Sequence, residues 1–507
     1  MGLEYLPPLI DRPAGRLVLL VCAACLCLAA CTALPQRSLP APEVGSPGSP
    51  IQLEDCQLAA PSLPLRLGAR CGKLAVYEDR AAGIGRQIEL NIALIPAISR
   101  NPAGDPIFFI PGGPGEAATQ SYPVLASAFE RLNQKRAVIL VDQRGTAGSN
   151  PLRCQAFDEL EGAGEDSQAL QKALADCLNA LEADPALYTT AIAMDDLDQV
   201  RAALGFETIN LYGASYGTRA ALAYLRQYPN RVRTVILDGA APPNWTLGPS
   251  TAADAQRALE SIFERCAGDI ACRAAFPNLA VEFQSLVEIL EQPARVTVAD
   301  PVSGEFSEFE LTVEFLTSAI HALSYTPETV ALLPLIIHTA ANQQDYSLLA
   351  AQALAVFHNI NESISSGMRL SVICAEDVPF YITQPAQPGY LGDSVVEGLR
   401  EACKFWPHGT IPADFHTPVH SDVPVLILSG EADPVTPPAN GELAAQTLPN
   451  SLHIITPGQG HINLFRGCIP DLATTFVETG SFQGLDTTCV EQIEPLPFFI
   501  NFSGPIP

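Results

Sequence analysis

A serine stands between two glycines in the stretch GASYG, residues 213–217, directly after an apolar run and directly before a helix-forming segment. Glycines allow the sharp turn that exposes a serine hydroxyl at the start of a helix, and this is the only G-x-S-x-G match in the chain. A serine that only caps the helix is the alternative. Its place between a strand and a helix favours Ser215 as a nucleophile.

A nucleophilic serine needs a general base, and the base needs an acid that orients it. All eight histidines follow Ser215 in the chain. In proteins with this turn, the three residues follow one another along the chain in the order serine, acid, histidine. The acid comes after the last strand but one, and the histidine comes after the last strand. The segments after the last two apolar runs offer Asp433 and His461. Glu431 is the alternative acid, and His453, inside the last run, is expected to pack.

Acyl transfer also needs hydrogen-bond donors for the oxyanion of the tetrahedral intermediate. The segment FFIPGGPGEAA, residues 108–118, follows an apolar run and offers backbone amides without side-chain obstruction at Gly112 and Gly113. A simple glycine-proline turn is compatible with this role, because the turn would present the amides. We expect the oxyanion hole to consist of the N–H groups of Gly113 and Tyr216.

Short apolar runs precede each of these segments and alternate with amphipathic helical segments. Runs of this kind are typical of strands buried on both faces, and the alternation predicts a doubly wound, mainly parallel sheet. The expected strands include IELNIALIP, then residues 106–113, 136–145, 207–215 and 233–241, and later 423–430 and 451–458, which are the seventh and eighth of the fold.

The alternation stops between residues 242 and 419, where the sequence is helical and loop-like. In open α/β sheets, ligands bind at the carboxyl ends of the strands, and a long insertion there would cover them. The sequence therefore predicts an α/β fold with a mostly helical cap over 242–419, inserted between the sixth and seventh core strands. The core parts are then 51–241 and 420–507.

Residues 1–30 have the pattern of a secretory signal. Two arginines precede an uncharged run from Leu17 to Cys31, which is shorter than the ~20 residues of a membrane-spanning helix. The ending Leu-Ala-Ala-Cys resembles the lipobox of bacterial lipoproteins, and a plain signal is the alternative. We expect lipidation at Cys31, a Pro- and Ser-rich tether over 31–50, and an exported protein anchored in the bacterial cell envelope, facing the periplasm or the exterior.

The net charge and the cysteines indicate which partners, bonds and metal sites to expect. The net charge of −27 would repel the phosphates of a nucleic acid, so nucleic acid is not an expected partner. An even number of cysteines, ten, follows the tether, which suggests disulfides in an exported chain. A zinc site is disfavoured, because no CxxC pair stands outside the leader. Pairing of nearest neighbours, which has a low loop-closure cost, predicts the disulfides 56–71, 154–177, 266–272, 374–403 and 468–489.

Seven motifs in register resemble the prolyl iminopeptidase and tripeptidyl aminopeptidase family of α/β-hydrolases, and most closely its exported tripeptidyl aminopeptidase branch. The resemblance covers roughly residues 70 to 490. The motifs are PGGPG, DQRGTAGSNPLRC, GASYGTRAALAYLRQYP, LDGAAPP, SVICAED, SGEADPVTPP and GQGH. One departure is Pro111, where many prolyl iminopeptidases have histidine, and it puts strict proline specificity in doubt.

The resemblance implies the α/β-hydrolase fold and a serine exopeptidase that needs no metal or other cofactor. It implies peptide substrates with a free N-terminus, from which short peptides or amino acids are released, and it leaves the oligomeric state open. A carboxylesterase of the same fold is the alternative, because a Ser-His-Asp triad cleaves esters as well as amides. A catalytically silent surface lipoprotein is a third possibility, which an intact triad disfavours.

The family places an acidic amine-binding group in or beside the cap, and the segment SVICAEDVPF offers Glu376 and Asp377. The expected Cys374–Cys403 disulfide would hold this backbone rigidly, and a carboxylate there could bind the substrate ammonium. We expect Glu376 to be the binding group, with Asp377 as the rival. The structural alternative is that both residues cap a turn or pair with an arginine.

Overall fold

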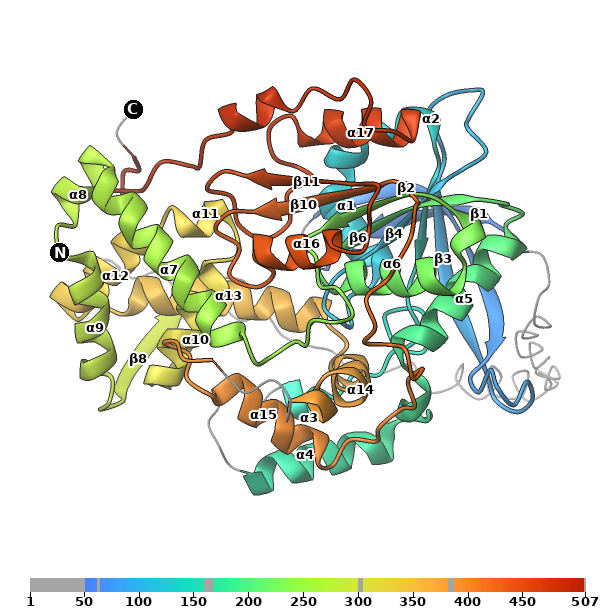
Figure 1. Cartoon of the computed structure of the whole chain (residues 1–507). Helices are drawn as coiled ribbons and strands as arrows, with labels where there is room; N and C mark the ends of the chain where they lie inside the picture. Colours follow the sequence, from blue (N-terminus) through green and yellow to red (C-terminus); the bar gives the residue numbers. More distant parts are fainter. Residues whose placement is uncertain (1–50, 62–63, 159–166, 300–303, 382–386, 506–507) are drawn as a thin grey trace, which may run out of the picture. The chain divides into compact units, whose positions relative to one another are not determined.

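A nine-stranded sheet forms the centre of the computed structural model, within the described residues 51–61, 64–158, 167–299, 304–381 and 387–505 (Figure 1). The strand order is β1-β2-β3-β5-β4-β6-β7-β10-β11. The strands are β1 (Glu54–Ala59), β2 (Arg66–Tyr77), β3 (Gln87–Ile95), β4 (Ile107–Ile110), β5 (Val138–Val141), β6 (Ile209–Ala214), β7 (Val232–Asp238), β10 (Val425–Gly430) and β11 (Ser451–Thr456).

The six strands from β5 to β11 in this order run parallel, whereas β1, β2, β3 and β5 pair in antiparallel fashion. The prediction of a mainly parallel sheet is therefore confirmed. The strands β1 and β2 were not predicted. They lie at one edge of the sheet and carry many exposed polar residues, so they lack the continuous apolar runs of the central strands.

Helices cover both faces of the sheet. The core on one face includes residues of α5, α6 and α16, and the core on the other face includes residues of α1 and α17. The helical elements of these parts are α1 (Ala118–Phe129), α2 (Leu132–Lys135), α3 (Gln155–Asp158), α4 (Ser167–Ala180), η1 (Pro185–Leu187), α5 (Thr190–Ala203), α6 (Tyr216–Gln227), η2 (Pro229–Arg231), α16 (Pro438–Ala445), α17 (Ile469–Thr479) and η4 (Thr488–Gln492).

The segment between β7 and β10 is mainly helical and has a hydrophobic core of its own. Figure 1 shows most of its helices gathered to one side of the sheet. Counted from β2, the segment follows the sixth strand, and β1 is an additional strand at the edge. Its elements are α7 (Thr251–Gly268), α8 (Ile270–Ala275), α9 (Leu279–Ile289), α10 (Val313–Leu323), α11 (Pro327–Val330), α12 (Leu333–Gln343), α13 (Ser347–Ser363), α14 (Ser366–Glu376), η3 (Val378–Phe380), α15 (Ser394–Cys403) and an unpredicted hairpin of β8 (Ala294–Ala299) and β9 (Phe306–Leu311).

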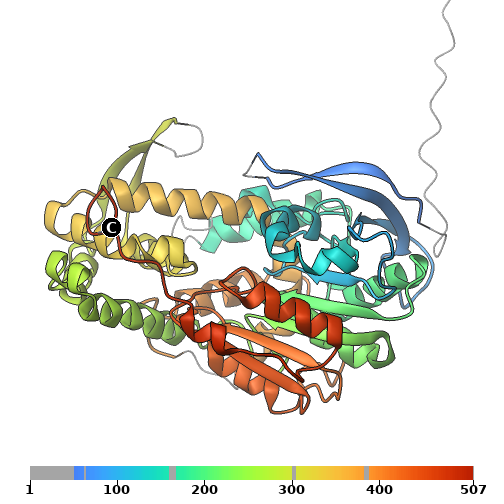
Figure 2. The same cartoon turned by 90° about the horizontal axis from the view of Figure 1, so that it is seen from above.

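The end of the described chain joins this helical segment to the sheet domain. Figure 2 shows the chain after α17 running across to the cap helices. Phe498 is buried in the core of the cap, where the Arg265 guanidinium lies 4.0 Å from the centre of its ring. The N–H of Phe499 donates a 2.9 Å hydrogen bond to the carbonyl of Ala331. This tail therefore fastens the cap to the core.

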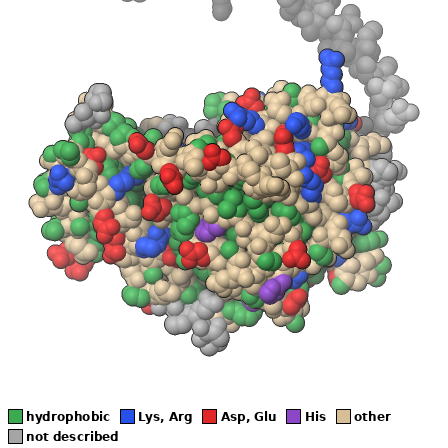
Figure 3. Space-filling view, turned by 45° about the horizontal axis from the view of Figure 1, so that its top comes forward, with side chains coloured by type: hydrophobic (Ala, Val, Ile, Leu, Met, Phe, Trp, Pro, Cys, Tyr) green, Lys and Arg blue, Asp and Glu red, His purple; other side chains and the backbone are tan. Residues whose placement is uncertain are grey.

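All five predicted disulfides are present with the predicted pairing, so the connectivity is confirmed. The predicted leader, Cys31 and the tether lie outside the described residues. Among the described residues, no helix has the length and apolar composition needed to cross a bilayer. On the face shown in Figure 3, basic side chains are interspersed with acidic ones rather than gathered in one patch.

Candidate active site

Ser215 occupies a strained turn between β6 and α6. Its backbone has φ +53° and ψ −123°, in the left-handed range of φ that residues other than glycine rarely adopt. Such a conformation costs about 1–3 kcal/mol and persists only where the surrounding structure enforces it. Ser215 is partly exposed, whereas its neighbours in the turn and in α6 are buried. The turn therefore presents the hydroxyl at the start of a helix, as expected for a nucleophile.

The two glycines of the turn allow close backbone packing. A Cβ at Gly217 would lie 2.1 Å from the carbonyl oxygen of Ile110, and a Cβ at Gly213 would lie 2.3 Å from the carbonyl oxygen of Gly217. Both contacts are with backbone, which cannot move aside as a flexible side chain can. The sequence pattern thus reflects the approach of α6 to the end of β4.

His461 and Asp433 are paired as predicted for a base and its orienting acid. The imidazole Nδ1 donates a 2.8 Å hydrogen bond to Asp433 Oδ2, which leaves Nε2 as the nitrogen that can accept a proton. The other oxygen, Oδ1, accepts hydrogen bonds from the backbone N–H groups of Val435 (2.8 Å) and Thr436 (2.9 Å). Thr436 Oγ1 donates to Asp433 Oδ2 at 2.9 Å and lies 3.1 Å from His461 Nδ1.

The charges of this pair support each other. Burial alone would raise the pKa of Asp433, but His461 and the two backbone N–H groups hold it below its usual value. Burial alone would lower the pKa of His461, but Asp433, followed by Asp238 and Glu116, raises it above 6.5. The fully buried Asp433 is thus kept ionised beside the base, as an orienting acid must be.

Asp238, at the end of β7, links the serine turn to the loop that carries His461. Its carbonyl oxygen accepts a 2.8 Å hydrogen bond from the N–H of Ser215. Its carboxylate accepts hydrogen bonds from the N–H groups of Asn463 (2.7 Å) and Leu464 (2.8 Å). One buried residue therefore positions both the nucleophile and the base, a role that sequence reasoning missed.

His461 is also held from two other sides. Its N–H donates a 2.7 Å hydrogen bond to the carbonyl of Tyr325 in the cap, and the two rings meet edge to face with centroids 5.6 Å apart. On the sheet side, a Cβ at Gly239 would lie 3.0 Å from His461 Cε1, so a side chain there would press on the imidazole. The cap is thus part of the base's support.

The two predicted oxyanion donors lie at the ends of β4 and β6. Gly113 has φ +98°, a conformation that suits glycine, and Tyr216 is the first residue of α6, where N–H groups have no acceptor within the helix. In the described part of the chain, neither N–H has a hydrogen-bond acceptor. Both amides therefore remain available for an oxyanion, and their role stays a prediction.

Glu376 and Asp377 are fully buried and already have partners. Glu376 accepts hydrogen bonds from the backbone N–H (2.7 Å) and the hydroxyl (2.8 Å) of Thr190, and that hydroxyl lies 2.7 Å from the Tyr216 hydroxyl. Asp377 forms two 3.0 Å hydrogen bonds with Arg219, the structural alternative considered above. Ammonium binding by either residue stays a prediction, and the contacts seen here support the turn that carries Ser215.

Glu116 was given no role in the sequence analysis, although it is the one charged residue in FFIPGGPGEAA. A Cβ built on Gly112 would lie 3.2 Å from Ser215 Cβ and 3.4 Å from Glu116 Oε1. Because both distances start from the same point, Ser215 Cβ and Glu116 Oε1 cannot be farther apart than the sum of the two. A lone carboxylate in a glycine-rich loop after a strand was the available signal. The sequence also carried a signal for Thr436. It stands three residues after Asp433, and at this spacing an aspartate side chain accepts hydrogen bonds from the backbone.

The rival residues of the sequence analysis lie elsewhere. Glu431 accepts a 2.9 Å hydrogen bond from the N–H of Gly458 at the surface, whereas Asp433 is the acid bonded to His461. His453 contacts Ser429 Oγ at 2.9 Å, and its ring packs against Gly441 in α16. Neither residue takes part in the predicted triad.

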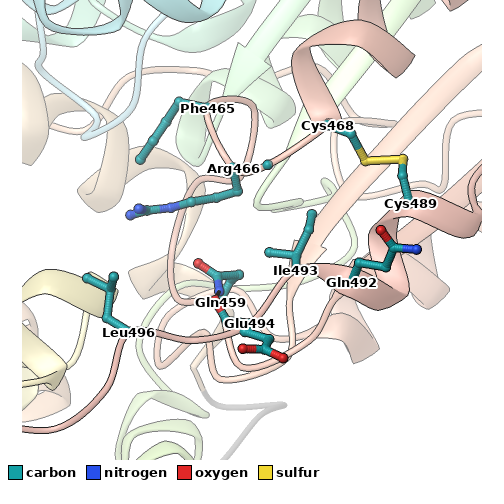
Figure 4. A pocket seen from close by; sticks show the side chains of 10 residues that line it. Gln459, Phe465, Arg466, Cys468, Cys489, Gln492, Ile493, Glu494 and Leu496 are labelled. Atoms are coloured by element: carbon teal, nitrogen blue, oxygen red, sulfur yellow. Dashed lines mark hydrogen bonds between the residues drawn. A yellow bond between two sulfur atoms is a disulfide. The ribbon is translucent and has the colours of Figure 1, made fainter. Parts of the chain in front are cut away.

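An open pocket of about 500 Å³ is lined in part by the segment that follows β11 (Figure 4). Gln459 and Arg466 are among its lining residues, together with the Cys468–Cys489 disulfide. The Arg466 guanidinium is paired with Glu328 at 2.6 Å and 3.0 Å. None of the three predicted triad residues lines this pocket, so we assign no catalytic role to it.

The site thus combines a partly exposed serine, a histidine–aspartate pair and two available amides, which together are the requirements of acyl transfer. The model of the alpha/beta hydrolase fold family matches residues 105–467. The serine protease Hip1 of Mycobacterium tuberculosis is 26% identical over 86% of this chain and 90% of its own length. The tripeptidyl aminopeptidase of Streptomyces coelicolor is 25% identical over 88% of this chain and 87% of its own.

Among solved structures, the proline iminopeptidase of Mycobacterium smegmatis is similar, with a TM-score of 0.40, 15% identity, and coverage of 80% of this chain and 98% of that one. The family match spans more than half of the chain and contains all three predicted triad residues. The expected resemblance to α/β-hydrolase peptidases is thereby confirmed, and the chain belongs to the α/β-hydrolase fold family.

Proposed function

We propose that the protein is an exported serine exopeptidase that releases single amino acids or short peptides from the free N-terminus of peptide substrates. The observation that carries this proposal is the His461–Asp433 pair on the loops after β10 and β11, with Ser215 in the strained turn after β6. The matches to proteins named as a serine protease and a tripeptidyl aminopeptidase support a serine hydrolase that acts on peptides.

In the proposed reaction, Ser215 Oγ attacks the scissile carbonyl while His461 Nε2 takes the hydroxyl proton. Asp433 holds the imidazole by its hydrogen bond to Nδ1 and stabilises the imidazolium that forms. The N–H groups of Gly113 and Tyr216 donate to the oxyanion, a contribution of about 3–4 kcal/mol per donor in enzymes of this type. His461 then protonates the leaving amine, and water releases the acyl group by the same route.

The competing activity is hydrolysis of simple esters, because the same triad serves both reactions. The test is a panel of chromogenic amides with one, two or three residues, each with a free and an acetylated N-terminus, together with a small uncharged ester. The proposal expects rapid release from amides with free N-termini and slow release from acetylated ones. Activity confined to the ester would favour a carboxylesterase instead.

Export and lipid anchoring are part of the same proposal. Five disulfides among the described residues support an oxidising compartment, because such bonds are rare in the reducing cytosol. Mass spectrometry of the mature N-terminus tests the anchor directly. A lipid-modified Cys31 is the expected first residue, and the Cys31→Ser variant should lack this modification. An unmodified N-terminus elsewhere would contradict the anchor.

A further inference from the structure

Thr190 lies between a carboxylate of the cap and the residue that follows the nucleophile. Its hydroxyl is 2.8 Å from Glu376 Oε2 and 2.7 Å from the hydroxyl of Tyr216, and its backbone N–H donates a 2.7 Å hydrogen bond to Glu376 Oε1. Gln143 Nε2 donates a 2.9 Å hydrogen bond to the Tyr216 hydroxyl. Thr190, Tyr216 and Glu376 are all buried, so bulk water does not compete for these hydrogen bonds.

The donors and acceptors give this hydrogen-bond chain one direction. An ionised carboxylate only accepts, so the single proton of the Thr190 hydroxyl goes to Glu376. The Tyr216 hydroxyl then donates its own proton to Thr190, and its oxygen accepts from the Gln143 amide. The chain therefore runs from Gln143 through Tyr216 and Thr190 to Glu376, and each hydroxyl in it both donates and accepts.

The place of Glu376 at the start of α5 favours its negative charge. Thr190 is the first residue of α5, where backbone N–H groups have no acceptor within the helix and a carboxylate is stabilised. Burial raises the pKa of Glu376 to about 7, although the charge of Arg219 and the two donors of Thr190 oppose this rise. Glu376 and Thr190 therefore depend on each other for their hydrogen bonds.

The turn of the cap that carries Glu376 is fixed by two further bonds. The next residue, Asp377, forms two 3.0 Å hydrogen bonds with Arg219 in the first turn of α6. Cys374, two residues before Glu376, is bonded to Cys403 of α15. Glu376 is therefore a rigid end point, from which a chain of hydrogen bonds can restrain the residue at its other end.

We propose that Glu376 and Thr190 are positioning residues for the oxyanion hole, which act on the N–H of Tyr216 through the hydroxyl of the same residue. This inference rests on the serine hydrolase part of the proposed function, in which that N–H donates to the oxyanion. Because the far end of the side chain is held, the residue keeps its place before the oxyanion forms. Preorganised donors of this kind stabilise a transition state without a cost of reordering.

This role differs from the ammonium binding that the sequence predicts for Glu376. A positioning role predicts equal losses for a peptide with a free N-terminus and for an uncharged ester, because both reactions form an oxyanion. An ammonium contact predicts a loss on the peptide alone, because the ester carries no positive charge. The choice of substrate therefore separates the two roles.

The experiment measures kcat and KM of Tyr216→Phe, Thr190→Val, Thr190→Ser and Glu376→Gln on a peptide 4-nitroanilide with a free N-terminus and on a small uncharged ester. A second readout is the inhibition constant of phenylboronic acid, which adds to a serine hydroxyl and imitates the tetrahedral intermediate. Tyr224→Phe is the matched control. The buried Tyr224 hydroxyl donates a 2.9 Å hydrogen bond to Asp198, so it joins α6 to α5 as the Tyr216 hydroxyl does.

Tyr216→Phe, Thr190→Val and Glu376→Gln should lower kcat about 10- to 100-fold on both substrates, since removal of a whole oxyanion donor costs about 10²- to 10³-fold. KM should stay within about twofold, and the inhibition constant of phenylboronic acid should rise by about the same factor as kcat falls. Thr190→Ser keeps the hydroxyl and should recover most of the activity, and Tyr224→Phe should match the wild type.

An unchanged kcat in Tyr216→Phe, or an equal fall in Tyr224→Phe, would overturn the assignment. A higher KM with an unchanged kcat, or a loss confined to the peptide in Glu376→Gln, would overturn it too. Tyr216→Phe decides even where Glu376→Gln does not fold, because it deletes a single oxygen. Hydrolysis of the ester alone by the wild type would refute the proposed peptidase, and the ester would then decide the positioning role.

Discussion

The backbone N–H of His461 donates a 2.7 Å hydrogen bond to the carbonyl oxygen of Tyr325, a residue of the cap. The edge-to-face contact of the two rings, with centroids 5.6 Å apart, adds a second restraint on the imidazole. The cap therefore does more than cover the site, because it helps to fix the proposed general base.

Replacing Tyr325 should reduce turnover without removing any reacting group. Tyr325→Ala deletes the ring that packs against His461, and a poorly oriented base should lower kcat about 10- to 100-fold. Tyr325→Phe keeps the ring and should stay within a few-fold of the wild type. Steady-state kinetics of both variants measure this, and equal activity of Tyr325→Ala and the wild type would exclude a supporting role for the ring.

Thr436 should matter through the orientation of Asp433. Thr436→Val removes the hydroxyl that donates to Asp433 Oδ2 at 2.9 Å, so one oxygen of the buried carboxylate loses a donor. We expect kcat to fall about tenfold with little change in KM, and Thr436→Ser to restore most of it. A change in KM alone would instead indicate a substrate contact.

The pH profile should report the charge pair. The base works as neutral imidazole, and Asp433 raises the pKa of His461, so activity should be full at higher pH and be lost as pH falls through a midpoint above 6.5. Asp433→Asn should move that midpoint downward and lower kcat by about 10⁴. Profiles of kcat/KM against pH test both, and a midpoint below 6.5 in the wild type would contradict the pairing.

The disulfides should contribute unequally to stability. Cys374–Cys403 joins residues 29 apart, whereas Cys266–Cys272 joins residues 6 apart. By loop entropy, the first should stabilise by about 3.5 kcal/mol and the second by about 2 kcal/mol. Thermal unfolding of the two double serine variants compares them, with the larger fall in Tm expected for the first pair. The reverse order would mean that native contacts, not loop length, dominate.

Much of the sheet and the triad could be predicted, because the signals for them lie in short stretches of the sequence. The central strands are continuous apolar runs, and the order serine, acid, histidine follows from the turn around Ser215. Sequence reasoning did not predict β1, β2 or the hairpin β8–β9. Exposed and buried residues are mixed along β1, β2 and β8, so these strands lack a continuous apolar run.

The supports of the triad were harder to predict. The hydrogen bond from His461 to Tyr325 ends on a backbone carbonyl, which every residue type has, so the sequence gives no signal for it. The proximity of Glu116 to Ser215 depends on how the glycine-rich loop folds back against Gly112, which local propensity does not specify. The burial of Glu376 and its bonds to Thr190 required knowledge of how α14 packs.

The most direct test of the proposed function is the kcat of Ser215→Ala on the best peptide amide of the panel, with Tm measured to verify the fold. Removal of a triad nucleophile typically lowers kcat by about 10⁴- to 10⁶-fold, and we expect a loss in this range with an unchanged Tm. A folded Ser215→Ala protein that keeps more than a tenth of the wild-type kcat would contradict the assignment of Ser215 as the nucleophile.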